Sequence, residues 1–331
     1  MDVKHFFFPF VAIALFTGCA QKVAISALEP AEVDRAAATK KIAVTAFQND
    51  NVGLSSKIEA AISSSKLDGK DYFTLMSRTD LDKILAEQQI QNSGMLDQGS
   101  AVKVGKLLGA QAIISGSVGK PTSSDVGYYV KRTKCNKDNC YEYNVACTKR
   151  TVGLSSEVRM IDVQRGDIIY ADQMVESAEW SHCNDDSKAM PSTEMGAQFL
   201  ATAMSKKFAF KLTPHYRTFN VTLLEDPDLE YSEPQEKLLE NALVYIKQNR
   251  YDRAEDLLTK LIESTGRESF VPIYNLGVIK EAQGDYVNAK NFYEAADKLT
   301  VEPVSEISAS IIRIDTLIEK RNAAMQQIQK G

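Results

Sequence analysis

Apolar positions between residues 38 and 222 recur with two spacings, one typical of strands and the other typical of helices. Alternating or continuous apolar residues predict strands at residues 42–46, 73–75, 112–118, 154–163 and 167–175. Apolar residues three or four positions apart predict helices at residues 54–62, 79–88, 101–108 and 192–204. This mixture predicts an α/β domain in which a mixed sheet is flanked by helices.

Local signals predict where three of these helices begin or end. Thr79, with Asp82 three residues later, resembles a capping box at the start of the second helix. Gly109 is predicted to end the third helix, because glycine readily adopts the left-handed conformation that follows many helices. Ser192 is predicted to open the fourth helix. One face of that helix collects the apolar residues Met195, Phe199, Leu200, Ala203 and Met204.

Two segments without a clear period bound the α/β domain, which is placed at residues 38–222. Residues 19–37 are predicted to be a tether. Residues 223–236 are acidic and interrupted by prolines, and are predicted to be a linker. The pattern from residue 237 to residue 331 is helical throughout. The chain of 331 residues is therefore predicted to hold an α/β domain followed by an all-α domain.

The C-terminal helices contain two similar units. Ala254 of the first unit corresponds to Ala289 of the second, and 289 − 254 = 35 is within one residue of the tetratricopeptide period. Small residues allow antiparallel helices to approach closely, whereas tyrosines wedge between successive hairpins. The residues assigned to this packing are Tyr251, Ala254, Gly277, Tyr286, Ala289, Tyr293 and Ala296. A generic pair of helical hairpins is the alternative. Residues 305–329 are predicted to form a capping helix.

The first residues have the pattern of a secretory leader, with a charged start, an apolar stretch and a small-residue exit. The apolar stretch from Phe6 to Phe16 is shorter than the roughly 20 residues that a membrane-spanning helix needs. Gly18-Cys19 resembles the bacterial lipobox, with Phe16 where leucine is usual. The resemblance implies a signal peptide at residues 1–18, a lipid on Cys19, and sorting to the outer membrane. A plain leader followed by an ordinary cysteine is the alternative.

Four cysteines follow Cys19 in the sequence. Cys135, Cys140, Cys147 and Cys183 are close together, and an even number of cysteines in an oxidising periplasm predicts one or two disulfides. A metal site that uses these thiols with His182 is the alternative, although the chain has no CxxC pair.

Charge and motifs exclude several classes of function. The net charge of −5 is unchanged after removal of the leader, which contains one lysine and one aspartate, and no basic run is present. The sequence therefore has no electrostatic footprint for nucleic acid. Nucleophile elbow, phosphate-loop and HExxH motifs are absent, so no enzymatic activity, cofactor or metal is predicted. The pairs Asp185-Asp186 and Asp226-Asp228 could bind a hard cation, but isolated acidic turns are usually solvated.

Four stretches of the α/β domain together resemble the CsgG family, whose members are outer-membrane lipoproteins that form a ring for export of curli subunits. They are residues 41–49, 72–88, 105–118 and 154–169. The resemblance implies a sheet flanked by helices, a lipid anchor ahead of it, and a tendency to form rings.

In the curli channel, two insertions per subunit form hairpins that cross the membrane. The corresponding segments here are residues 119–153 and 172–192. A membrane strand needs about 9–11 residues with an apolar side chain at every second position. Lys149 interrupts the apolar face of the first segment, and residues 176–186 are still more polar. Both insertions are therefore predicted to be soluble hairpins held by the cysteines.

These features predict a non-enzymatic lipoprotein on the periplasmic face of the outer membrane. It would form a homo-oligomer and act in the assembly or export of a surface structure, while the repeats dock periplasmic or secreted protein partners. One alternative is a ring-shaped secretion channel in the outer membrane. Another is a monomeric lipoprotein that regulates a periplasmic enzyme.

Overall fold

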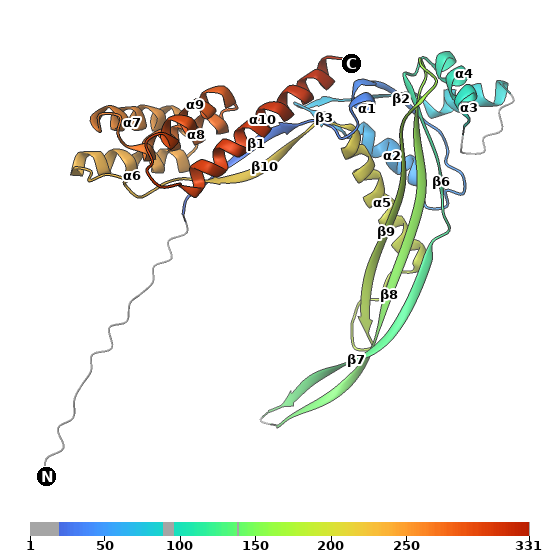
Figure 1. Ribbon diagram of the computed structural model, residues 1–331. Coiled ribbons are helices and arrows are strands. Elements are labelled where there is room, and N and C mark those ends of the chain that lie inside the picture. The colour runs from blue at the N-terminus through green and yellow to red at the C-terminus, as the bar shows by residue number, and fades with distance from the viewer. Residues whose placement is uncertain (1–19, 89–95, 138, 331) are drawn as a thin grey trace, which may run out of the picture. The chain divides into compact units, whose positions relative to one another are not determined.

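The computed structural model describes residues 20–88, 96–137 and 139–330 (Figure 1). The chain is divided into two compact units. Residues 28–216 and the C-terminal residues from 320 onward form one, which we call the α/β unit. Residues 217–319 and the N-terminal residues up to 27 form the other, which we call the helical unit.

A six-stranded mixed sheet forms the centre of the α/β unit, as predicted. The strands are β5 (Thr74–Leu75), β2 (Lys41–Val44), β6 (Ala112–Val118), β8 (Asn139–Asp162), β7 (Thr122–Asn136) and β9 (Ile168–Cys183). β2 pairs in parallel with β5 and β6, whereas β6 pairs with β8 in antiparallel orientation. β8 also pairs in antiparallel orientation with β7 and β9. A short hairpin of β3 (Lys66–Leu67) and β4 (Lys70–Asp71) lies outside this sheet.

Helices cover both faces of the central strands. They are α1 (Asp34–Ala38), α2 (Leu54–Ser63), α3 (Arg78–Glu87), α4 (Gln98–Leu108) and α5 (Thr193–Leu212). Ile42 and Val44 of β2 belong to the core that includes α2 and α5, whereas Ala43 belongs to the core that includes α3 and α4. Because alternate residues of a strand point to opposite faces, β2 is buried on both sides.

Two helix starts differ from the prediction. The side chain of Ser77, not Thr79, caps α3, and its hydroxyl accepts a hydrogen bond from the amide of Asp80 at 3.3 Å. Asp97 caps α4, so this helix begins before Ala101. Gly109 ends α4 with a φ of 74°, and the Ser192 side chain caps α5, both as predicted.

The predicted buried face of α5 is wrong in part. Met195 and Phe199 are 57% and 61% exposed, while Gly196 lies against the sheet. A Cβ atom on Gly196 would lie 3.0 Å from Val152 and 3.2 Å from the Trp180 ring. The small residues therefore bring the helix axis close to the sheet, and bulky residues are left on the outer side.

The helical unit contains a series of helices that follow one another along the chain. They are α6 (Glu233–Lys247), α7 (Tyr251–Ser264), α8 (Phe270–Ala282), α9 (Tyr286–Asp297) and α10 (Ser305–Gln329), of which α10 ends in the α/β unit. Each of α6 to α8 packs against the next helix. This agrees with the predicted all-α region after the sheet.

A strand occupies part of the segment that was expected to be a tether. Residues Lys22–Glu29 form β1, which pairs with β10 (His215–Thr222) in a two-stranded sheet. Val23, Ile25 and Ala27 are buried in the core of the helical unit. These alternating apolar residues are the strand signal that the sequence analysis did not use, and α1 also begins within the expected tether.

Most residues assigned to repeat packing are buried. Ala254, Tyr286, Ala289, Tyr293 and Ala296 are at most 4% exposed, and Tyr251 is partly buried. Gly277 is also buried, and a Cβ atom placed on it would lie 2.7 Å from the ring of Tyr293. The absence of a side chain on Gly277 therefore lets α8 and α9 approach closely.

Replacement of Gly277 by alanine is expected to destabilise the helical unit by about 1–3 kcal/mol, the usual range for an overpacked core. The Tyr293 ring has little freedom to move, since its hydroxyl donates a hydrogen bond to Glu281. The measurement is urea unfolding followed by circular dichroism. Glycine to alanine inside a helix normally stabilises by about 0.5–1 kcal/mol, so increased stability of Gly277→Ala would contradict the close approach.

Candidate functional site

Three long strands continue the sheet of the α/β unit outward (Figure 1), and α5 still covers their inner part at Val152 and Trp180. We call residues 122–153 and 172–183 the extension. β7 pairs with β8 from Thr122–Gly153 to Asn136–Asn139, while β9 pairs with the opposite edge of β8. The first predicted insertion is thus a hairpin. The second predicted insertion, residues 172–192, is not a hairpin. Residues 172–183 continue β9, which pairs with the 24-residue β8 along the edge opposite to β7.

Two disulfides link strands within the extension. Cys147 of β8 lies opposite Cys183 of β9, and these cysteines are bonded across a separation of 36 residues. Cys135 and Cys140 are opposite each other near the β7–β8 turn and form the second disulfide. Cys147 and Cys183 are buried with Val145. The prediction of one or two disulfides is confirmed, and the alternative metal site loses its thiolate ligands.

The acidic pair near Cys183 is neutralised by the protein itself. Arg132 forms ion pairs with Asp185 at 3.1 Å and with Asp186 at 3.2 Å. Asp186 also accepts a hydrogen bond from the Cys183 amide, which together with Arg132 lowers the pKa of its carboxyl group. The ring of His182 contacts the carbonyl oxygen of Lys188 at 2.8 Å. These contacts attach the segment after β9 to the extension and give it a structural role.

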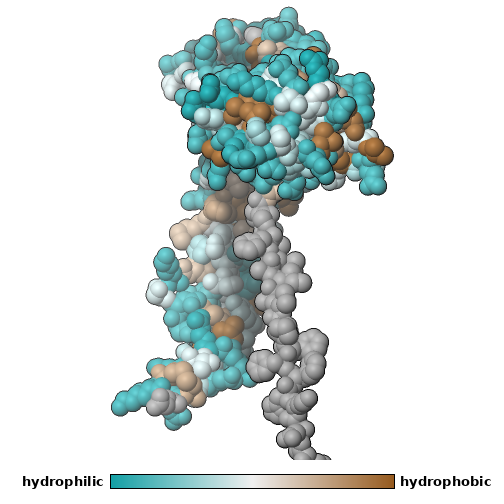
Figure 2. Space-filling view, turned by 90° about the vertical axis from the view of Figure 1, so that its left-hand side faces the viewer, coloured by the Kyte–Doolittle hydropathy of each residue, from teal (hydrophilic) through white to brown (hydrophobic). Residues whose placement is uncertain are grey.

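Charged residues occur on both faces of the extension. Residues that face the same side as Cys147 include two ion-paired sets, Lys149–Glu179 at 3.2 Å and Arg132 with the two aspartates. The opposite face has the pairs Lys131–Glu142 at 3.4 Å and Arg150–Asp125 at 2.6 Å. Exposed tyrosines lie among them, with Tyr129 75% and Tyr141 55% exposed. Figure 2 shows this mixture of hydrophilic and hydrophobic residues towards the lower end of the molecule.

The outer edges of β7 and β9 have no strand partner within the described part of the chain. β7 contains 15 residues and β9 contains 16, so both edges are long. α5 adds exposed apolar side chains, since Phe199 is 61% and Phe210 is 51% exposed. The extension therefore offers backbone hydrogen-bonding groups, and α5 offers apolar surface.

In the helical unit, the extended segment around Thr222 and Leu224 is bound to α8. Asn275 of α8 is fully buried and holds the backbone of Leu224 through both its N–H and its C=O, at 3.0 and 2.7 Å. The hydroxyl of Tyr274 donates to the carbonyl of Thr222 at 2.8 Å. Leu223 is buried. The start of the predicted linker 223–236 is therefore fixed to α8. Residues 223–232 have an irregular backbone, whereas residues 233–236 already belong to α6.

A buried charge network stabilises the same helices. Glu281 is 1% exposed, and its carboxylate accepts two hydrogen bonds from Arg313, each at 2.8 Å. The hydroxyl of Tyr293 donates to the same carboxylate at 2.5 Å. Sequence analysis missed this network, because a glutamate and an arginine 32 residues apart look like ordinary surface residues of two helices.

The pKa values of several tyrosines make the helical unit sensitive to alkaline pH. Burial raises the pKa of Tyr231 and Tyr274 to about 12 from the ordinary value of 10.0, and burial with Glu281 nearby raises that of Tyr293 further. In the unfolded chain these tyrosine hydroxyls ionise at about pH 10, before those of the folded unit. The stability that the buried neutral hydroxyls contribute is therefore complete below about pH 10 and is lost as the pH rises through the folded pKa values.

Thermal unfolding of the helical unit, followed by circular dichroism, is expected to shift to lower temperature as the pH rises from about 9 to about 12. Replacement of Tyr231 by phenylalanine removes one of these hydroxyls and should flatten the dependence. A melting temperature that stays constant over this range would contradict the pKa assignments.

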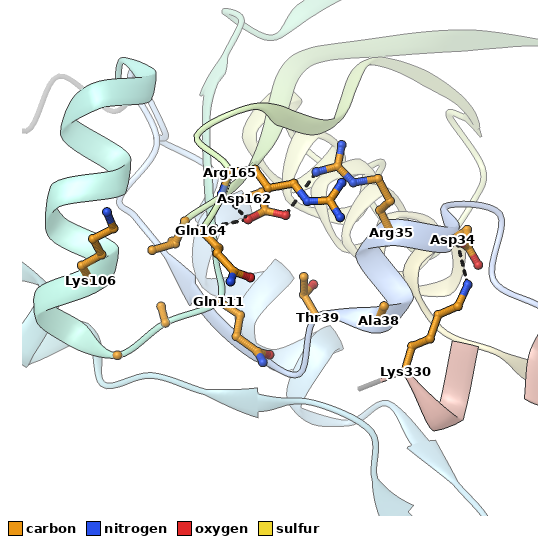
Figure 3. Close-up of a pocket in the computed structure, with 13 residues that line it drawn as sticks. Asp34, Arg35, Ala38, Thr39, Lys106, Gln111, Asp162, Gln164, Arg165 and Lys330 are labelled. Atoms are coloured by element: carbon orange, nitrogen blue, oxygen red, sulfur yellow. Dashed lines mark hydrogen bonds and ion pairs between the residues drawn. The ribbon is translucent and has the colours of Figure 1, made fainter. Parts of the chain in front are cut away.

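The largest pocket described in the α/β unit has a volume of about 730 Å³ (Figure 3). Its charged groups mainly bind one another: Arg35 holds Asp167 at 2.7 Å and Asp162 at 3.1 Å, and lowers the pKa of Asp167. The hydroxyl of Thr39 donates to the carbonyl of Ala36. Among the residues that line it, none forms a nucleophile–base pair.

Residues 20–184 match the family described as curli production assembly/transport component CsgG, and this part of the chain is a CsgG family domain. Comparison with curated proteins gives no match. Within the described residues, no helix combines the length and the apolar composition that a bilayer crossing requires.

Three solved structures are similar to parts of the chain. Lipoprotein GNA1162 from Neisseria meningitidis has 15% identity and a TM-score of 0.25, covering 51% of this chain and 98% of its own. The LpoB C-terminal domain from Salmonella enterica has 13% identity and a TM-score of 0.21, covering 42% and 82%. A PelC dodecamer from Paraburkholderia phytofirmans has 14% identity and a TM-score of 0.22, covering 58% and 98%. These values carry no conclusion about activity or assembly.

The predicted site residues fall into three groups. The four cysteines of the extension are joined as disulfides, and the repeat residues lie in the core of the helical unit. Cys19, the predicted lipid attachment site, lies outside the described residues. Asn275 and Glu281 are the polar residues that sequence analysis did not identify.

Proposed function

We propose that the protein is a non-enzymatic lipoprotein of the CsgG type, anchored through Cys19 on the periplasmic face of the outer membrane. It forms a homo-oligomer there and serves as a scaffold for the assembly or export of a surface structure. The observation that carries this proposal is the disulfide-linked extension, whose two outer strand edges are long and unpaired in the described chain.

Strand edges of this length are the natural contact between copies. An exposed edge of 15 or 16 residues presents a row of free N–H and C=O groups, which proteins normally cover. The β7 edge of one copy can pair with the β9 edge of the next. Such a head-to-tail contact closes into a ring when the rotation between copies closes. Disulfides stabilise the strands in an oxidising compartment.

Charge favours the scaffold over a channel. Both faces of the extension carry lysine or arginine in ion pairs, so neither face is continuously apolar. A lysine or arginine that faces lipid near the middle of a bilayer costs about 2–4 kcal/mol, and a ring would repeat this cost in every copy. The extension is therefore better suited to an aqueous environment than to a membrane.

The helical unit is proposed to be a pair of tetratricopeptide-like hairpins that dock periplasmic or secreted proteins. Its face at Asn275 is occupied by the chain's own residues around Leu224. Docking of a partner would therefore use other surfaces of the unit. Val287 on α9 is 66% exposed and belongs to such a surface.

The experiment measures the mass of the purified acylated protein in detergent together with its conductance in a planar lipid bilayer. A defined oligomer that gives no conductance is expected. Large, stable conductance steps would establish the secretion channel instead, and a monomer would favour the regulator of a periplasmic enzyme. The Cys19→Ser variant, which lacks the acyl acceptor, is the matched control and should retain the oligomer without membrane attachment.

A further inference from the structure

Gln21 is fixed to the helical unit by three hydrogen bonds. Its amide N–H donates to the carboxylate of Glu225, and its side chain donates to the carbonyl of Leu243 at 2.9 Å. Its carbonyl oxygen accepts from the amide of Leu223 at 2.9 Å. The next residues continue into β1, where Val23 and Ile25 are buried in the same core. The chain is thus immobilised from Gln21 onward.

Cys19 precedes Gln21 by only two residues. Because an extended residue spans at most about 3.6 Å, two residues of chain can separate an attachment point at Cys19 from Gln21 by at most about 7 Å. A lipid on Cys19 would therefore have almost no free chain between it and a folded surface. This differs from the tether of residues 19–37 that the sequence suggested, which would have allowed a separation of tens of ångströms.

We propose that the surface of the helical unit around Ala20 is a membrane-contact face, held flat against the bilayer by the lipid of Cys19. This inference rests on the lipidation in the proposed function. Ala20 lines a shallow pocket together with Glu225, Asp226, Val304 and Glu306. The contact face is thus defined by the residues of this pocket.

The charge of this face selects the kind of bilayer surface. Glu225, Asp226 and Glu306 make it acidic, and anionic lipids would repel it over a distance of about one Debye length, roughly 8 Å. The ammonium group of a zwitterionic headgroup complements the carboxylates. A leaflet rich in zwitterionic lipid is therefore the surface that fits.

The test measures the depth of two fluorescent labels on full-length acylated protein in phosphatidylethanolamine–phosphatidylcholine vesicles. The labels are attached to Asp226→Cys, within the contact face, and to Val287→Cys on α9, which contributes no residue to it. Figure 1 shows α9 well separated from the start of β1. Lipids with a nitroxide headgroup should quench the label at position 226 several-fold more strongly than the label at position 287.

A second variant distinguishes attachment from chance proximity. Insertion of ten glycine and serine residues between Ala20 and Gln21 adds a flexible chain of roughly 17 Å root-mean-square length, and should remove the difference between the labels. Equal quenching at both positions of the uninserted, demonstrably acylated protein would overturn the membrane-contact face. A mass spectrum without acyl chains would instead refute the lipid anchor itself, and the contact face with it.

Discussion

Replacement of Glu281 by leucine is expected to lower the free energy of unfolding of the helical unit by about 3–5 kcal/mol. This is the usual cost of removing one partner of a buried ion pair, because the other charge is left buried and unpaired. The change leaves the guanidinium of Arg313 without its carboxylate and removes the acceptor of the Tyr293 hydroxyl. Urea unfolding followed by helical circular dichroism measures the loss. Trp180 is the single tryptophan of the chain and belongs to the α/β unit, so its fluorescence reports on the other unit.

Two further variants isolate the cause. Combination of Glu281→Leu with Arg313→Met should recover much of the lost stability, because an apolar pair often replaces a buried ion pair without cost. Asp315→Ala breaks the exposed pair with Lys290 and should change the urea midpoint little. If Glu281→Leu changed the urea midpoint as little as Asp315→Ala, the carboxylate of Glu281 would be solvated and not buried.

Removal of the Cys147–Cys183 disulfide by serine replacement is expected to destabilise the extension by about 4 kcal/mol, which is the chain-entropy estimate for a loop of this length. The disulfide joins residues 36 apart, whereas Cys135 and Cys140 are 5 apart and their removal should cost about 2 kcal/mol. Trp180 precedes Cys183 by three residues on β9, so its fluorescence reports on this region directly.

The matched control is the double serine variant at Cys135 and Cys140. Replacement of all four cysteines should loosen the extension and leave the sheet with α2 and α5 folded, as hydrogen exchange of peptides from β2 and β6 would show. Cooperative unfolding of the entire α/β unit in the four-serine protein would mean that the extension is part of the core and not an addition to it.

The sequence predicted the central strands because their signal is local. Ala112–Val118 begins with three apolar residues and ends with a fourth, between Gly109 and Gly119, and it becomes β6, buried on both faces. β1 was missed for the opposite reason. Its alternation of Val23, Ile25 and Ala27 is short, and its partner strand begins at His215, nearly the whole α/β unit further along the chain. No local pattern contains that pairing.

For the extension, the sequence predicted disulfide bonds but not the arrangement of the residues that form them. The cysteines indicated disulfides, but their pairing depends on the register of β7, β8 and β9, which spacing alone does not define. Helical periodicity placed Phe199 on the buried face of α5, whereas the side-chain-free Gly196 is the residue that contacts the sheet. The buried pair of Glu281 and Arg313 was missed because helical wheels classify both residues as polar.

The distance along the chain between β1 and the core that buries it has a consequence for folding. Leu223, whose amide donates to the carbonyl of Gln21 just before β1, follows Gln21 by 223 − 21 = 202 residues. Until the chain from Leu223 onward is available, Val23 and Ile25 have no core to enter. Folding of the helical unit is therefore a late, high-contact-order event, and the apolar residues of β1 stay exposed during that interval. Chains truncated before α6 would retain this exposed strand permanently, which makes them substrates for quality control.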